Sequence, residues 1–244
     1  MNGSPLRPRS IDLNADLGEG FPNDRALLEL VTSASICCGA HAGSDDVIRQ
    51  TLSAAKISGV VVGAHPGYAD REGFGRRDQY LRFGELHDLI VGQVDHLRSI
   101  AATLDLEVAF IKPHGALYNQ AQRDSDLATA VVMAAALGLL PLVGLPGSLL
   151  EVEARRCQWP YVAEGFPDRR YRDDGSLVPR SEPDAILQGP AEIEVQVLRL
   201  VNEGRVGTLC IHGDDPRAVA NAELVRRVLS EHGISIHSFL EEPI

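Results

Sequence analysis

The sequence has 244 residues, of which 44% are hydrophobic, and a mean hydropathy of −0.05, which predicts a water-soluble protein with a substantial core. Its formal net charge of −11 and pI of about 5.1 argue against nucleic acid or an anionic membrane as a partner, since both attract basic surfaces. Residues 1–10 lack the apolar stretch of a signal peptide, and no later apolar run has the length of a membrane span. We therefore expect a cytoplasmic protein in which residues 1–10 form a flexible extension.

Strand-like and helix-like segments alternate along the chain. Short apolar runs of strand length occur at residues 11–13, 34–37, 60–63, 108–111, 140–143, 161–163, 208–211 and 234–237. Segments with the apolar spacing of helices lie between most of them, at residues 44–57, 84–104, 125–137, 190–202 and 216–231. This order predicts a parallel sheet with right-handed crossovers. Seven or eight such units favour a closed (β/α) barrel that spans residues 11–244 as one domain, with an open doubly wound sheet as the alternative.

Four histidines follow predicted strands and lie among glycines. They are His41, His65, His114 and His212. In a (β/α) barrel the C-terminal ends of the strands form the catalytic mouth, so this placement directs four imidazoles toward one pocket. A single histidine at a strand end is more often a structural residue, and only the repetition favours a functional site.

Lys112 and the first strand supply further polar groups at the predicted mouth. Lys112 is one of two lysines, against 21 arginines, and it follows an apolar run. Its ammonium can titrate, whereas a guanidinium cannot. Asp12, Asn14 and Asp16 alternate in step with a strand and can share one side, although we expect the turn to begin before Asp16. The two aspartates can act as bases, as orienters of an imidazole or as metal ligands.

The least regular stretch, residues 164–188, is predicted to be a long functional loop. If it folds over the mouth, Arg169 and Tyr171 can bind a substrate carboxylate. An ordinary surface loop is the alternative. The sequence contains no GxxxxGK[ST], GxGxxG, HExxH or GxSxG motif, so any ATP is bound in another way or by another chain.

Longer motifs resemble the LamB/YcsF family of 5-oxoprolinase A subunits, from residue 11 to the C-terminus. They are IDLNADLGEG (11–20), CGAHAG (38–43), GAHPG (63–67), DREGFGR (70–76), KPHGALYN (112–119) and GSLVPRS (175–181). The resemblance implies a seven-stranded (β/α) barrel of the glycoside hydrolase/deacetylase type. It also implies ATP-dependent opening of 5-oxo-L-proline to L-glutamate, with Mg²⁺ and partner subunits B and C. Two features depart from the family pattern: Ala40 replaces an aromatic residue of many members, and residues 204–207 are short.

The chemistry of this reaction suggests hypothetical roles for the residues at the predicted mouth. Asp12 or Asp16 with His114 prepares a water molecule, while Lys112 and His65 stabilise developing negative charge. The expected substrate-binding residues are Asn14, His41, Arg169, Tyr171 and His212.

Two other functions stay open. The first is a metal-dependent amidohydrolase or deacetylase that acts without ATP, because an aspartate with two histidines makes a competent divalent-metal site. Its candidate ligands are Asp12, Asp16, His41, His65 and His114. The second is a non-catalytic subunit that delivers substrate to a partner. The sequence also leaves open whether the chain forms a homo-oligomer.

Overall fold

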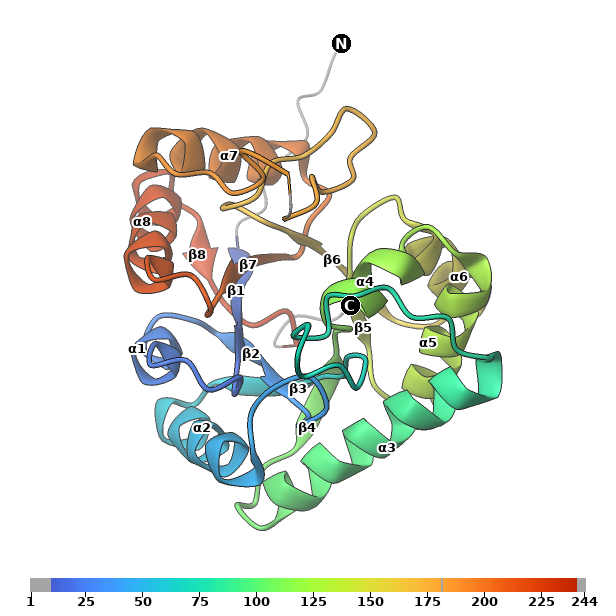
Figure 1. The fold of residues 1–244 in the computed structure, drawn as a ribbon. Coiled ribbons are helices and arrows are strands. Elements are labelled where there is room, and N and C mark those ends of the chain that lie inside the picture. The colour runs from blue at the N-terminus through green and yellow to red at the C-terminus, as the bar shows by residue number, and fades with distance from the viewer. Residues whose placement is uncertain (1–9, 181, 241–244) are drawn as a thin grey trace.

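A computed structural model describes residues 10–180 and 182–240 of the chain. Seven parallel strands form a closed barrel, because β1 pairs with β2 on one side and with β7 on the other (Figure 1). The barrel strands are β1 (Ser10–Leu17), β2 (Ser33–Cys37), β3 (Val61–His65), β4 (Val108–Ile111), β5 (Leu142–Gly144), β6 (Tyr161–Gly165) and β7 (Thr208–His212). The short β8 (Ser235–Ile236) pairs with the start of β1 outside the ring. The structure thus confirms the predicted barrel over the open sheet, while residues 1–9 of the expected extension lie outside the described range.

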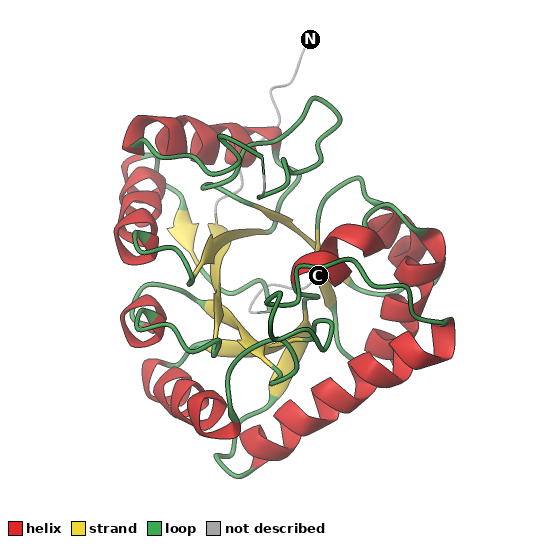
Figure 2. Ribbon diagram, viewed as in Figure 1, coloured by secondary structure: helices red, strands yellow, loops and turns green. Residues whose placement is uncertain are grey.

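Helices surround the barrel (Figure 2). They are α1 (Asp24–Leu28), α2 (Asp45–Ser58), α3 (Phe83–Ala102), α4 (Gly115–Ala121), α5 (Ser125–Leu137), α6 (Leu149–Arg156), α7 (Pro190–Glu203) and α8 (Ala218–Glu231). The sequence did not predict α1, α4 or α6, since helices of five, seven and eight residues are too short to show a repeating apolar pattern. Within the described residues, no helix combines the length and apolar character needed to cross a membrane.

Local signals set several helix boundaries. The Ser44 hydroxyl accepts a hydrogen bond from the Val47 amide at the start of α2, as an N-cap residue does. Gly59 and Gly204 end α2 and α7 in the left-handed conformation, with φ of 68° and 63°. The short stretch 204–207 therefore leads directly from α7 into β7. α8 begins at residue 218 rather than at the predicted 216, because the Asp215 carboxylate binds the amide of residue 217 in a preceding turn.

Alternation along β1 separates the core from the barrel interior. Its apolar residues join the hydrophobic core shared with the helices, whereas Asp12, Asn14 and Asp16 contact polar groups of other strands inside the barrel. β1 continues to Leu17, so the expected turn before Asp16 is wrong. Parallel pairing with both neighbours, which places Asp16 opposite Ser35 and His212, keeps the strand extended.

An apolar cluster fills part of the barrel interior. Phe110 on β4 packs with Val143 and Val162, and the chain after β8 adds Phe239, whose ring centroid lies 5.3 Å from that of Phe110. Lys112 lies two residues beyond Phe110 along the strand direction. Polar and charged side chains therefore gather at the C-terminal ends of the strands, which is the usual place for the active site of a (β/α) barrel.

Candidate active site

Lys112 is the centre of a buried charged cluster. Its Nζ lies 2.7 Å from Asp16 Oδ1 and 3.1 Å from Glu164 Oε2. It also donates to Asn14 Oδ1 and lies against the Cys210 sulfur, both at 3.1 Å. The lysine is 1% exposed, so its charge is matched by protein groups rather than by water.

The two members of the ion pair keep each other charged. Burial alone lowers the pKa of Lys112, but the surrounding Asp16, Cys210 and Glu164 together outweigh that effect and raise it well above its usual range. Burial likewise acts to raise the pKa of Asp16, and interactions with His65, Lys112 and His212 together reverse this and lower it. Burial raises the pKa of Glu164, so this second carboxyl holds a proton more readily than Asp16. The cluster therefore contains one firmly ionised carboxylate and one ammonium.

His65 and His114 face each other through their unprotonated nitrogens. His65 Nδ1 lies 2.7 Å from the Lys112 carbonyl oxygen, and His114 Nε2 lies 2.9 Å from that of Phe74. Because a carbonyl only accepts, each of these nitrogens carries the ring proton. The remaining nitrogens, His65 Nε2 and His114 Nδ1, are 3.0 Å apart. Burial lowers the pKa of His65 to about 4 and that of His114 well below its usual range, so both rings are neutral near pH 7.

Glu19 and His41 complete this histidine cluster. Glu19 Oε1 lies 3.3 Å from His114 Nδ1 and 3.2 Å from His41 Nε2. The His41 ring stacks on the His114 ring with centroids 3.8 Å apart and planes 1° apart. Gly67 makes the stack possible, since a Cβ there would lie 2.9 Å from His41 Nδ1 and 3.2 Å from His114 Cβ. Ala40, beside His41, instead lines a separate pocket of about 430 Å³.

The histidine cluster fits a divalent cation. Two neutral imidazole nitrogens at hydrogen-bond distance, neither with a proton to offer, need a proton or a metal ion between them. Ligand atoms of Glu19, His65 and His114 all lie within 4.8 Å of one another. Imidazole nitrogens and a carboxylate are common ligands of zinc and related ions, and such an ion would supply Lewis acidity at the mouth.

Asp12 lies outside this cluster. Its carboxylate accepts hydrogen bonds from the hydroxyls of Thr32 at 2.7 Å and Ser33 at 2.8 Å, and from that of Thr208. Burial raises the pKa of Asp12 to about 6, although these hydroxyls oppose the shift. Asn14 connects the surroundings of Asp12 with those of Lys112, because its amide donates to Thr208 Oγ1 at 2.6 Å while its oxygen accepts from the lysine. Asp12 thus supports the site through hydroxyl and amide groups rather than facing its opening.

His212 lies at the rim with the long loop after β6. Its Nδ1 is 2.9 Å from Asp168 Oδ2, and its ring stacks on Phe166 with centroids 5.3 Å apart. The structure places Arg169 and Tyr171 in the packing of the loop itself. The Arg169 guanidinium donates to loop carbonyls, including that of residue 178 at 2.7 Å, and the Tyr171 hydroxyl accepts from the Phe166 amide.

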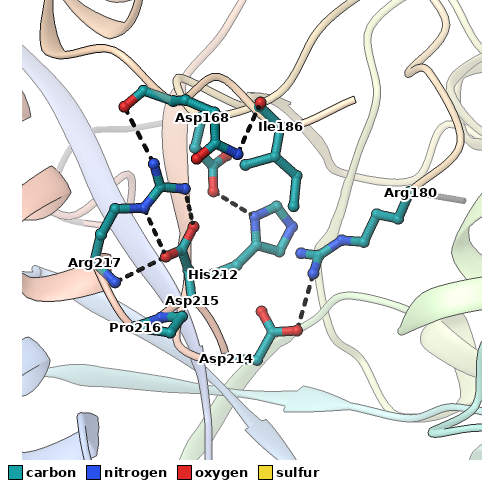
Figure 3. A pocket seen from close by; sticks show the side chains of 9 residues that line it. Asp168, Arg180, Ile186, His212, Asp214, Asp215, Pro216 and Arg217 are labelled. Carbon is teal, nitrogen blue, oxygen red and sulfur yellow. Dashed lines mark hydrogen bonds and ion pairs between the residues drawn. The ribbon is translucent and has the colours of Figure 1, made fainter. Parts of the chain in front are cut away.

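Several charged residues of the site were not predicted from the sequence. Glu164 fell within the predicted loop but lies in β6. It comes two residues after Val162, so the two side chains point to the same side of the strand, into the barrel. This spacing was the signal that could have found it. Asp168, Arg180 and Asp214 gather around His212 (Figure 3), and no sequence pattern indicates that their segments meet.

The sequence is similar to that of known proteins over nearly its whole length. A family model described as the LamB/YcsF family matches residues 11–243. The 5-oxoprolinase A subunit of Neisseria meningitidis serogroup C is 43% identical over 242 residues, which cover 93% of this chain and 99% of the relative. The 5-oxoprolinase A subunit of Methylococcus capsulatus is 43% identical over 247 residues, which cover 93% of this chain and 95% of the relative.

Solved structures show the same barrel. A lactam utilization protein from Thermus thermophilus superposes with a TM-score of 0.86 at 39% identity, covering 94% of this chain and 100% of that one. The catalytic domain of a peptidoglycan N-acetylglucosamine deacetylase from Eubacterium rectale reaches a TM-score of 0.56 at 10% identity, covering 97% of this chain and 91% of that one. The second likeness concerns the fold alone, and it confirms the expected deacetylase-like barrel.

Proposed function

The chain belongs to the LamB/YcsF family, and from this premise we propose that it is the A component of an ATP-dependent 5-oxoprolinase. In this proposal the enzyme hydrolyses the lactam of 5-oxo-L-proline to L-glutamate and cleaves ATP, together with subunits B and C. Support comes from the near full-length match to relatives named as A subunits of 5-oxoprolinase. The structural observation that carries the chemistry is the buried Lys112–Asp16 ion pair beside two neutral imidazoles.

The cluster can perform the two tasks that lactam opening requires. The attacking water must lose a proton, and negative charge on the carbonyl oxygen must be stabilised. His65 and His114 are neutral near pH 7, so either imidazole can accept the proton. Asp16, 3.5 Å from His65 Nε2, then stabilises the imidazolium. Lys112 keeps Asp16 ionised and adds a fixed positive charge beneath the reacting carbonyl.

ATP supplies what this cluster lacks. A five-membered lactam is unreactive, and transfer of the γ-phosphoryl group of ATP to its amide oxygen, with release of ADP, makes the ring carbon more electrophilic. Water then attacks that carbon, the ring C–N bond breaks to give an acyl phosphate, and a second water hydrolyses the acyl phosphate to glutamate and phosphate. We assign ATP with Mg²⁺ to the assembled enzyme. Asp16 is a better candidate than Asp12 for the group that orients the imidazole, because three hydroxyls already occupy the Asp12 carboxylate.

The test is reconstitution with subunits B and C, 5-oxoproline and MgATP, with glutamate and ADP both measured. We expect the two products in equal amounts, and we expect loss of both when Lys112→Met is used in an otherwise assembled enzyme. Turnover that survives substitution of Lys112 and Asp16 would instead identify a non-catalytic, substrate-delivering subunit.

Metal-dependent amide hydrolysis without ATP is the second candidate. The observation that favours it is the pair of facing nitrogens of His65 and His114, with Glu19 beside them. Protein purified without chelator should then contain about one equivalent of divalent metal and should hydrolyse amides without ATP. His114→Asn should remove the metal. Metal-free protein that turns over only with ATP and partner subunits eliminates this candidate.

A further inference from the structure

A pocket of about 360 Å³ opens beside His212 at the rim of the barrel. Its walls come from the long loop after β6 and from the turn after β7 (Figure 3). His212 also belongs to the deeper site, since its ring nitrogen, an Asp16 oxygen and the Cys210 sulfur all lie within 4.8 Å of one another. A small ligand in this pocket is therefore next to the charged cluster.

Arg180 and Arg217 line the pocket, Arg169 follows the lining residue Asp168, and the three arginines differ in what holds them. Arg217 is closed off by Asp215, with its Nη2 2.9 Å from Oδ2 and its Nε 3.2 Å from Oδ1. Arg169 donates to carbonyls of its own loop. Arg180 reaches the pocket from the opposite side to Arg217 (Figure 3), and its Nη1 lies 2.9 Å from Asp214 Oδ2.

Arg76 meets the same oxygen of Asp214 as Arg180 does. One carboxylate thus serves two guanidinium groups, so each arginine keeps N–H donors that Asp214 does not use, while Asp168 adds a further carboxylate to the pocket wall. A guanidinium has five N–H donors, and for both arginines the bond to Asp214 is the one side-chain hydrogen bond among the described residues. Their side chains are 38% and 23% exposed, so the remaining donors are accessible to a ligand.

We propose that Arg180 and Arg76 bind the carboxylate of 5-oxoproline, and that Asp214 holds the two guanidinium groups in position. This inference rests on the proposed function and adds the residues that select the substrate. A guanidinium binds a carboxylate through paired N–H donors. With the carboxylate at the arginines, the lactam ring would lie along His212, and its carbonyl group would be next to the charged cluster that contains Lys112 and Asp16.

The test compares two substrates that differ only at the carboxylate. 5-Oxoproline and its amide, 5-oxoprolinamide, are assayed with the reconstituted enzyme carrying Arg180→Met, Arg180→Lys or Arg76→Met. We expect Arg180→Met to lower kcat/KM for 5-oxoproline by about 10- to 100-fold, mainly through KM, and to leave the amide within about threefold. Arg180→Lys should recover part of the loss, because lysine keeps the charge without the paired donors.

Arg172→Met is the matched control. Arg172 lies in the same loop and pairs with Glu182 at 2.6 Å, outside the pocket, and we expect both substrates to behave as with wild type. Equal losses on both substrates in Arg180→Met would mean that Arg180 only supports the loop, and a raised KM for ATP instead would assign the arginines to phosphate. Either result overturns the inference. If the wild-type enzyme does not hydrolyse 5-oxoproline, the proposed function itself is refuted.

Discussion

Two aspartates at different levels of the barrel interior have pKa values that are shifted in opposite directions. Asp12 and Asp16 lie on one face of β1, yet burial raises the pKa of Asp12 to about 6, whereas the pKa of Asp16 is lowered. Both carboxylates are buried. Asp12 has three neutral hydroxyls around it, while Asp16 has an ammonium and imidazoles.

The difference shows what charged neighbours do that hydrogen bonds alone do not. Hydroxyl donors only partly offset the cost of burying a carboxylate, whereas the groups around Asp16, which include Lys112 Nζ at 2.7 Å, together reverse it. The level that contains Asp16 therefore presents a permanent anion and cation at the mouth. The level that contains Asp12 is a hydrogen-bonded support that can exist without charge. Four substitutions test this contrast, here in order of decreasing effect.

Lys112→Met should cause the largest loss. It leaves Asp16 buried without its cation, so we expect turnover to fall by at least about 1000-fold and the free energy of unfolding to fall by about 3–5 kcal/mol. Reconstituted assays and urea denaturation measure the two effects. Lys56→Met is the control. Because 48% of the Lys56 side chain is exposed, this substitution should change the free energy of unfolding by less than about 1 kcal/mol. Similar behaviour of the two variants would contradict the central role of Lys112.

Asp16→Asn should lower turnover by about 100- to 1000-fold with a smaller loss of stability. The variant keeps the shape of the side chain but removes the anion that stabilises a protonated His65. The pKa of His65, followed by NMR titration, should drop below its wild-type value of about 4. An unchanged titration would show that Asp16 does not act on His65.

Asp12→Asn should change the pH dependence of stability more than it changes turnover. The folded pKa of about 6 exceeds the usual 3.8, so the folded state holds this proton more tightly. The wild type therefore loses stability as pH rises from about 4 through 6, by up to about 3 kcal/mol. The amide that replaces the carboxyl cannot ionise, so the stability of the variant relative to wild type should increase over that window. Unfolding curves at several pH values measure this, and parallel pH profiles would argue against an ionising Asp12.

Ser33→Ala should have the smallest effect. It removes one of the hydroxyls that donate to Asp12 and should cost about 1 kcal/mol, with turnover within about threefold of wild type. Ser35 is the matched control, because it faces the same way on β2 and its hydroxyl has no hydrogen-bond partner among the described residues. Ser35→Ala should be neutral in thermal denaturation, and equal costs for the two serines would exclude a specific role for the Ser33 hydroxyl.

The sequence could predict the parts of the site that follow from strand periodicity. Histidines after apolar runs and the alternation of β1 indicated which side chains share the mouth, and Lys112, Asp16, His65 and His114 do meet there. Glu164 was assigned to a loop, because three apolar residues are too few to fix where β6 ends.

Side chains of the long loop could not be placed in the same way. A guanidinium in such a loop can bind a ligand or a backbone carbonyl, and residue type does not distinguish the two. Arg169 donates to loop carbonyls while Arg180 faces the pocket. The tautomers of His65 and His114 also depend on carbonyls of residues 112 and 74, which only the folded chain brings into range.

Closure of the ring between β1 and β7 has a consequence for how the protein folds. The amide of Asn14 bonds to the hydroxyl of Thr208, 194 residues later in the chain. At a synthesis rate of about 5–20 residues per second, roughly 10–40 s separate the two strands on the ribosome. During that interval β1 has an unpaired edge that can associate with other strands. We therefore expect the contacts between β1 and β7 to form late in folding, and an intermediate lacking β7 to be exposed to aggregation.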